Sequence, residues 1–362
     1  MAYATISKPG LHFNTITWTG NDASPRAMTG VGFQPDLCWG KTRGSVKSHQ
    51  IIDAVRGANK TLSSDGTGAE GTNYGNGYLS SFDSDGFTSI AGTSATSNWN
   101  GNGLTYVGWN WKASGSTASN TDGSTTSTVS ANTTAGFSIF KFTGTNGNTT
   151  VGHGLGAVPE MFIIKNTAQA GHWMVYHKDL QSPAGKQMYL NLTNAQASDT
   201  GWLQNTAPSS SVITLGANAD SNGSGNVMIG YAFRSIKGYS KVGKYQGNGS
   251  ATDGTFVYCG FKPAFVLLKV GYASAGADFS ASWNIFDNRR DGYNSITKRL
   301  VPNNNAADAS SSTQAIDFLS NGFKLYSNNT DQNSSSGVYM YYAVAEEPLV
   351  ANVGQSIPAT AE

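Results

Sequence analysis

The sequence has few cysteines and little charge, and it lacks any long apolar run. Cys38 and Cys259 are its only cysteines, which excludes a fold held together by a disulfide framework. Each lies in or beside an apolar segment and is expected to be small, buried and reduced. No stretch approaches the roughly 20 apolar residues of a membrane-spanning helix, so no membrane insertion is expected.

Charge is scarce as well. Charged residues make up 12% of the chain and the formal net charge is +1. A protein that binds nucleic acid usually carries a basic stripe, and this sequence has none, so nucleic acid is not an expected partner. The N-terminus lacks the basic start and apolar region of a secretory signal. Synthesis in a cytoplasm, without export by that route, is therefore expected.

Turn-forming and aromatic residues are abundant. The chain contains 44 glycines, 16 tyrosines, 16 phenylalanines and 8 tryptophans. Glycine together with many Ser, Thr and Asn residues favours turns and strands over long helices. The aromatic side chains supply large apolar area for the faces of sheets. The composition predicts a folded, all-β protein.

One sequence motif, which we call the Gly/Pro phrase, occurs three times. It consists of a glycine turn, a proline, an apolar run and a closing lysine. The three copies are GVGFQPDLCWGK (30–41), GHGLGAVPEMFIIK (152–165) and CGFKPAFVLLK (259–269). A separation of roughly 100–125 residues is the size of a domain rather than of a solenoid unit. Each phrase is expected to begin a core strand buried on both faces, with the closing lysine leaving the sheet to meet water.

These patterns predict three tandem antiparallel β-sandwich domains, jelly-roll-like and related by internal repeat. D/N-G turns in GYLSSFDSDGFTSI (77–90) and AIDFLSNGFKLYS (315–327) support the same design in the first and third copies. The expected divisions are repeat 1 with an N-terminal arm (1–113), a Ser/Thr/Gly/Asn-rich linker (114–134), repeat 2 (135–238), repeat 3 (239–348) and a C-terminal arm (349–362).

Motifs for chemistry are weak. GTGAEG (66–71) matches a dinucleotide-binding pattern, but no helix pattern follows it. GYSKVGKY (238–245) lacks the Ser/Thr of a phosphate-binding loop. The histidines, including His172 and His177, have no cysteine cluster beside them, and 218–226 is a polar loop of low acidic density rather than a strong calcium loop. No cofactor and no metal site is expected, although a weak calcium site stays open.

Paired carboxylates could indicate a glycosidase, which needs two carboxyl groups at a set separation in a cleft. The clusters are Asp83/Asp85, Asp287/Asp291 and Glu346/Glu347, each in or near a turn or strand end. Turn chemistry explains such positions, so no catalytic residue is expected. Trp99 and Trp202 lie in polar, glycine-containing surroundings. They are weak candidates for stacking on sugars, and the alternative is that each plugs a loop onto its own domain or onto a neighbouring subunit.

The ordered phrases resemble a known family. GVGFQPDLCWGK with HQIIDAVRG, then TVGHGLGAVPEMFIIKN, then GFKPAFVLLK with WNIFDNRRDGYN, closely resemble tandem-domain proteins of tailed bacteriophages, common in phages of aquatic and marine bacteria. The resemblance spans about Ile16 to Glu347. It implies a β-sandwich structural or tail-fibre-like protein exposed on the virion. It carries no catalytic residues.

That resemblance leads to a non-enzymatic phage structural protein, assembled in the host cytoplasm and carried on the particle surface. The leading expectation is a tail-associated fibre or adhesin that helps the particle attach to host-surface polysaccharide. The alternative is a capsid decoration or cement protein, and a weaker alternative is a polysaccharide-degrading tail enzyme. Other virion proteins are the expected partners, and a homo-oligomer, by analogy a trimer, is expected.

Overall fold

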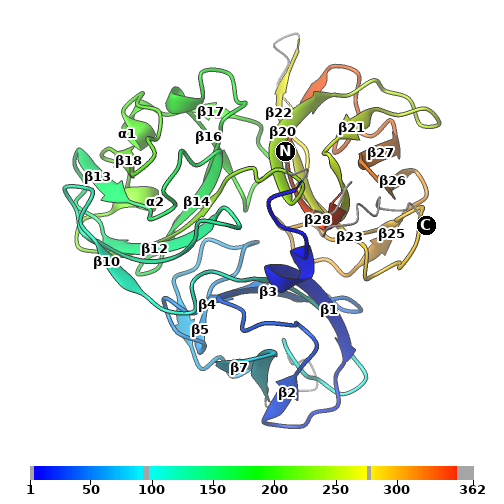
Figure 1. Ribbon diagram of the computed structural model, residues 1–362, viewed down its shortest axis with the longest axis horizontal. Coiled ribbons are helices and arrows are strands. Elements are labelled where there is room, and N and C mark those ends of the chain that lie inside the picture. The colour runs from blue at the N-terminus through cyan, green and yellow to red at the C-terminus, as the bar shows by residue number, and fades with distance from the viewer. Residues whose placement is uncertain (1–3, 93–97, 275–278, 349–362) are drawn as a thin grey trace.

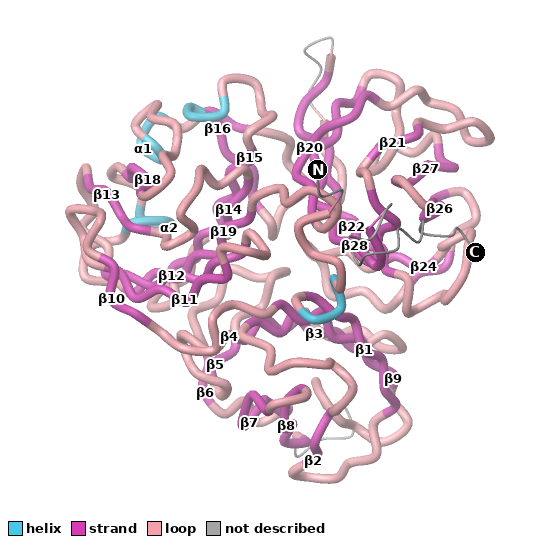
Figure 2. The backbone as a smooth tube through the Cα atoms, viewed as in Figure 1, coloured by secondary structure: helices cyan, strands magenta, loops and turns pink. Residues whose placement is uncertain are grey.

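The computed structural model describes residues 4–92, 98–274 and 279–348. Its strands gather into three lobes around a common centre (Figure 1). Helical structure in the described residues is confined to single turns: η1 (Pro9–Leu11), η2 (Pro183–Gly185), α1 (Thr200–Leu203) and α2 (Ala219–Asn222). Strands and loops make up nearly all the rest (Figure 2), so the predicted all-β class is confirmed.

Lobe 1 is the lower, blue-to-cyan lobe of Figure 1. Its strands are β1 (Phe13–Thr19), β2 (Arg26–Met28), β3 (Leu37–Thr42), β4 (Gln50–Asp53), β5 (Lys60–Thr61), β6 (Gly71–Thr72), β7 (Gly77–Asp83), β8 (Gly86–Ala91) and β9 (Thr105–Trp111). An inner sheet has the order β1-β9-β3-β4, and an outer sheet has the order β2-β8-β7. The strands β5 and β6 form a separate pair.

Lobe 2 has the largest sheet. Its strands are β10 (Ala118–Asn120), β11 (Ser127–Asn132), β12 (Phe137–Thr143), β13 (Thr149–Gly152), β14 (Met161–Asn166), β15 (Met174–His177), β16 (Lys186–Tyr189), β17 (Ala197–Ser198), β18 (Val212–Leu215) and β19 (Val227–Phe233). The inner sheet has the order β10-β11-β12-β19-β14-β15-β16-β17, and β13 pairs with β18 as the outer sheet.

Lobe 3 resembles lobe 1 in its layout. Its strands are β20 (Ser240–Gln246), β21 (Phe256–Tyr258), β22 (Phe261–Ala273), β23 (Asn284–Asp287), β24 (Lys298–Arg299), β25 (Ala309–Ser310), β26 (Gln314–Leu319), β27 (Gly322–Ser327) and β28 (Gly337–Pro348). The inner sheet has the order β20-β28-β22-β23 and the outer sheet has the order β21-β27-β26. The strands β24 and β25 form a short pair.

The three inner sheets share one arrangement. In each, the last long strand of the lobe (β9, β19 or β28) lies between the strand that contains the phrase (β3, β14 or β22) and one earlier strand (β1, β12 or β20). The phrase strands β3, β14 and β22 pair antiparallel with β9, β19 and β28, and then with β4, β15 and β23. This common register lets positions be matched between lobes. That the lobes derive from one repeated unit stays a prediction.

The phrase strands β3, β14 and β22 are buried on both faces of their inner sheets, as the apolar runs predicted. One face packs against the outer sheet of its own lobe, as Cys38 and Phe87 do in lobe 1. The opposite faces of all three inner sheets meet in one central core. The Trp111 ring contacts Phe137 of lobe 2 at 6.4 Å and Phe265 of lobe 3 at 5.5 Å between centroids.

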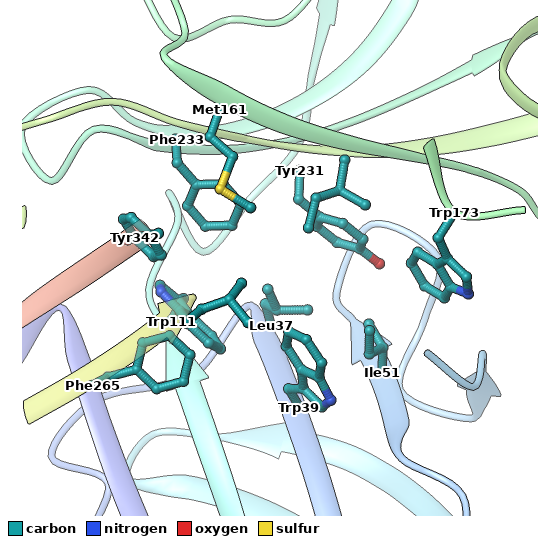
Figure 3. A pocket seen from close by; sticks show the side chains of 12 residues that line it. Leu37, Trp39, Ile51, Trp111, Met161, Trp173, Tyr231, Phe233, Phe265 and Tyr342 are labelled. Carbon is teal, nitrogen blue, oxygen red and sulfur yellow. The ribbon is translucent and has the colours of Figure 1, made fainter. Parts of the chain in front are cut away.

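The centre of this core is nearly filled. Side chains from the three lobes point toward one another there, with Trp39 and Trp111, Met161 and Phe233, and Phe265 and Tyr342 facing inward (Figure 3). They leave a cavity of about 20 Å³. Since a single water needs about this much space and also two or more polar partners, the cavity serves packing rather than ligand binding.

We call the three interfaces between lobes seams. A polar contact crosses each seam, so that the three contacts form a ring. Tyr231 of lobe 2 donates a hydrogen bond of 2.7 Å to Asp53 of lobe 1. Trp109 of lobe 1 bonds Asp287 of lobe 3 at 3.0 Å. The ring is completed where the His177 imidazole of lobe 2 meets the Tyr341 carbonyl of lobe 3 at 3.4 Å. Each lobe therefore touches both others through buried polar groups as well as apolar ones.

The closing lysines of the three phrases are buried, so the expectation that they meet water was wrong. Lys41, Lys165 and Lys269 each direct the ammonium group at main-chain carbonyls. Lys269, for example, donates 2.7 Å bonds to Thr193 of lobe 2 and to Ala281. Desolvation lowers the pKa of Lys41 and Lys165 to about 8 and that of Lys269 to about 7.

The segment 114–134, expected to be a linker, belongs to lobe 2. It contains β10 and β11, and β11 pairs with β12 along its whole length, from Ser127 opposite Phe142 to Asn132 opposite Phe137. Val129 is buried in the core of lobe 2. Small polar residues here serve an edge of a sheet rather than a free connection. The expected C-terminal arm, 349–362, lies outside the described residues.

Candidate functional site

The two tryptophans proposed to stack on sugars are not exposed. Trp99 is 1% exposed and Trp202 is 0% exposed. Trp99 packs parallel to Trp18, with ring planes 4° apart, and lies so close over Gly40 that any side chain there would collide with its ring. Trp202 packs against Phe162 in the core of lobe 2. Both tryptophans plug loops onto their own lobes, and neither can stack on a ligand.

Exposed aromatic side chains occur instead on the outer sheet of lobe 3. On β21, Phe256 is 44% exposed and Tyr258 is 54% exposed, while Val257 between them is buried. This alternation places both rings on the solvent side of the sheet. Tyr326 and Lys324 on β27 are partly exposed, and Lys324 is paired in register with Phe256. We call Phe256, Tyr258, Lys324, Tyr326 and Lys241 the outer aromatic face.

Charged groups fix the positions of these rings. Lys241 lies 5.3 Å from the ring centre of Tyr258 and donates a 2.7 Å bond to the Tyr258 carbonyl. Lys324 lies 5.7 Å from the ring centre of Tyr326 and bonds Asp253 at 2.7 Å. That bond lowers the pKa of Asp253 and raises the pKa of Lys324. The outer aromatic face thus combines ring faces with ordered hydrogen-bonding groups.

The matching positions of the other lobes carry no such rings. In lobe 1, the register that pairs Val257 with Phe323 pairs Met28 with Phe87, so Ala27 and Thr88 stand where lobe 3 has Phe256 and Lys324. In lobe 2, the outward residues of the outer pair are small, and Thr150 lies opposite Thr214. The same outer-sheet positions carry no exposed rings in two lobes. The aromatic residues of lobe 3 are therefore not a requirement of the fold.

Flat rings beside polar side chains are suited to carbohydrate. The CH-rich face of a sugar packs on an aromatic ring, while its hydroxyl groups bond to charged and amide groups beside it. The sequence indicates this face in TFVYCGF, because the residues on both faces of β21 are apolar there. Sequence reasoning missed it because a wholly apolar run resembles a buried strand.

Two of the carboxylate clusters considered for glycosidase activity, Asp83/Asp85 and Asp287/Asp291, make structural contacts. Asp85 accepts hydrogen bonds from the backbone of Gly30 and Gly32, which lower its pKa. Asp287 is fully buried and bonds Arg290 at 2.6 Å, and Asp291 accepts from the backbone of Thr297 at 2.6 Å. These groups hold turns and seams together.

The sites considered for metals are likewise used by the fold. His172 bonds Asn191 at 3.0 Å, and His177 lies in the lobe 2–3 seam. Within 218–226, Asn218 caps α2 by accepting from the backbone of Ser221. Among the described residues, no group of three or more His, Cys, Asp or Glu side chains could hold an ion. No helix in that same part of the chain is long and apolar enough to cross a membrane.

Both cysteines are buried and free, as predicted. Burial raises the pKa of the Cys259 thiol to about 12 and that of Cys38 further, so neither forms a reactive thiolate. Their role is packing: Cys38 lies in the core of lobe 1 and Cys259 in that of lobe 3.

The chain matches a known protein family. A family model described as a domain of unknown function, DUF7483, covers residues 8–348. This span includes all three lobes and extends from η1 to the end of β28. No curated protein matches the sequence. Because the model covers nearly the whole chain, this protein belongs to the DUF7483 family.

Proposed function

We propose that this protein is a non-enzymatic structural component of a bacteriophage particle, carried on the particle surface and contributing to attachment to host glycans. The resemblance of its ordered phrases to tandem-domain phage proteins supports the class of protein. The fused central core supports it as well, since a surface protein of a particle must persist without repair or turnover. The tail-associated adhesin is the role we favour.

The observation that carries the attachment role is the outer aromatic face. Exposed rings cost solubility, and the matching strands of the other two lobes carry none. A single such face binds sugars weakly, because few groups contact each sugar unit. Several copies on one particle would raise the effective affinity by multivalency. An adhesin works under these conditions.

A capsid decoration or cement role is the second candidate. It is favoured by the closed ring of three lobes around one core, a shape that complements a site of threefold symmetry on a shell (Figure 1). In that role the outer aromatic face would contact shell proteins. The homotrimer expected by analogy with fibres stays a prediction in either case.

Quantitative mass spectrometry of purified particles tests the proposal through the copy number relative to the major capsid protein. Roughly a few tens of copies or fewer per particle would support the tail. Hundreds would move the protein to the shell and overturn the adhesin role. Absence from purified particles would overturn the virion assignment itself.

The attachment role has its own test on the isolated protein. We expect the double variant Phe256→Ser/Tyr258→Ser to lose at least about tenfold in binding to host-cell polysaccharide presented at high density, since each stacked ring contributes about 1 kcal/mol. Tyr74→Ser, at another partly exposed aromatic residue, is the matched control and should bind as wild type does. Equal binding by all three proteins would contradict the role of this face.

A further inference from the structure

An open hollow of about 360 Å³ lies in the seam between lobes 1 and 2. It is lined by Arg56, Ala69 and Glu70 of lobe 1 and by Lys141, Thr167, Ala168 and Val227 of lobe 2. Small-molecule sites usually have volumes of about 300–1,000 Å³, so the hollow has room for a ligand of monosaccharide size. Its wall is apolar at the alanines and Val227 and charged elsewhere.

The charged wall carries an excess of positive charge. The Arg56 guanidinium is buried and rigid, bonded to Asp53 at 2.5 Å and to Glu70 at 3.1 Å. Lys60 also pairs with Glu70, at 3.2 Å. Lys141 donates a 3.1 Å bond to the Val55 carbonyl and, within the described residues, forms no ion pair. Among the lining residues, Arg56 and Lys141 thus supply two positive charges against the one carboxylate of Glu70, and the ammonium of Lys141 keeps N–H donors for a ligand.

The two other seams contain positions equivalent to those that line the hollow, and the three seams can be compared residue by residue. A backbone bond marks the equivalent point in each seam: Glu70 to the Thr167 carbonyl at 2.8 Å, Gln196 to Gly271 at 2.8 Å, and Asp308 to Arg43 at 2.7 Å. The register of the inner sheets matches the same residues independently, since Lys41, Lys165 and Lys269 stand two positions earlier.

Large side chains occupy that place in the other seams. In the lobe 3–1 seam, Arg43 reaches Asp308 and forms a 3.1 Å ion pair. In the lobe 2–3 seam, the Tyr272 hydroxyl meets Lys244, the counterpart of Lys141, at 3.5 Å. The lobe 1–2 seam has Thr167 and Ala168 at the matching positions. Each of the other seams thus has one large side chain at these two positions. The hollow is open because the lobe 1–2 seam has none, and Lys141 lacks the partner that Lys244 has.

We propose that this hollow binds a sugar acid through its carboxylate. The Lys141 ammonium supplies a charge-assisted hydrogen bond to the carboxylate. Ala69, Ala168 and Val227 pack against the CH face of the ring, and Glu70 accepts from a hydroxyl group. The site stands independently of the proposed attachment role, which rests on another face of another lobe.

The test uses the full chain and two probes, glucuronate and N-acetylneuraminate, with glucose as the uncharged comparison. Ligand-observed NMR or calorimetry measures the affinity. We expect at least one of the two acids to bind with a Kd of about 1 mM or tighter, and glucose to bind at least tenfold more weakly. Absence of binding by both acids, or equal binding of glucose, would overturn the proposal.

Three variants locate the site. Thr167→Arg copies the side chain of the lobe 3–1 seam, should pair with Glu70, and should abolish binding of the acid. Lys141→Gln keeps size and hydrogen bonding but removes charge, and should weaken binding at least tenfold. Lys244→Gln, at the matched lysine of the lobe 2–3 seam, should leave affinity unchanged. If Lys141→Gln binds like wild type, or if Lys244→Gln weakens binding equally, the hollow is not the site.

Discussion

Lys269 illustrates how a buried cation is accommodated in this fold. Its two acceptors, the carbonyls of Thr193 and Ala281, need only two N–H donors, and a neutral amine supplies both. Burial can then lower the pKa of Lys269 to about 7 without breaking a bond. Lys165 has three carbonyl acceptors, and desolvation by burial lowers its pKa to about 8.

The lowered pKa of Lys269 predicts a pH dependence of stability. Between the folded pKa of Lys269, about 7, and its ordinary value of 10.5, the unfolded chain holds a proton that the folded chain has released. Folding is therefore penalised at low pH, and the free energy of unfolding rises as the pH increases through this window. From about pH 7.5 to about pH 9.5 we expect Lys269 to contribute a gain of about 2 kcal/mol.

Urea unfolding of wild type and Lys269→Met at both pH values measures this contribution. The variant should lack the gain, while Lys186→Met, at a partly exposed lysine, should keep it. An unchanged pH slope in Lys269→Met would contradict the argument. If that variant does not fold, a flat pH profile of the wild type would contradict it equally.

Side-chain environments were the least predictable feature of the sequence. Trp99 and Trp202 lie among polar residues, yet each is buried by partners distant in sequence, as Trp18 is for Trp99. The phrase lysines end apolar runs, where a cation normally turns to water. For two of them, a carbonyl of another lobe accepts from the ammonium, as Thr67 of lobe 1 does for Lys165, whereas the acceptors of Lys41 are local. No local pattern encodes such partners.

At the scale of elements, local chemistry predicted more. The D/N-G turns at Asp85–Gly86 and Asn321–Gly322 join hairpins β7–β8 and β26–β27, as expected. Gly86 has a φ of 146°, which side-chain-bearing residues rarely adopt. The polar segment 114–134 was wrongly predicted to be a linker, because Ser, Thr and Asn are common both in linkers and at exposed edges of sheets. Pairing with β12, rather than composition, makes β11 a strand.

A proline in β11 distinguishes these two interpretations. Thr128 pairs with Lys141 on one side and Ser119 on the other, so Thr128→Pro removes a ladder donor inside the sheet. We expect the free energy of unfolding to fall by about 3 kcal/mol. Thr121→Pro, in the turn between β10 and β11, should cost far less. Chemical denaturation measures both, and equal small effects would mean that the segment behaves as a linker.

At the scale of the whole molecule, the three lobes share one core. Trp111 contacts rings of both other lobes, and the polar ring of seams links each lobe to its two neighbours. The sequence predicted three tandem units with their own cores. It did not predict the central core, because apolar residues on the second face of each inner sheet look the same whether they meet a helix, a subunit or a sister lobe.

The central core predicts which lobes a core substitution destabilises. Trp111→Ala should destabilise by about 3–5 kcal/mol and speed hydrogen exchange in β3, β14 and β22 together, because its cavity borders all three lobes. Phe87→Ala removes a ring of similar burial whose aromatic contacts, Trp18 and Trp99, lie within lobe 1. Its exchange should speed mainly in β3, since opening of one sandwich can remain local. Hydrogen exchange followed by mass spectrometry separates these patterns. If Trp111→Ala affected β3 alone, the three lobes would be independent folding units and the shared core only a contact between them.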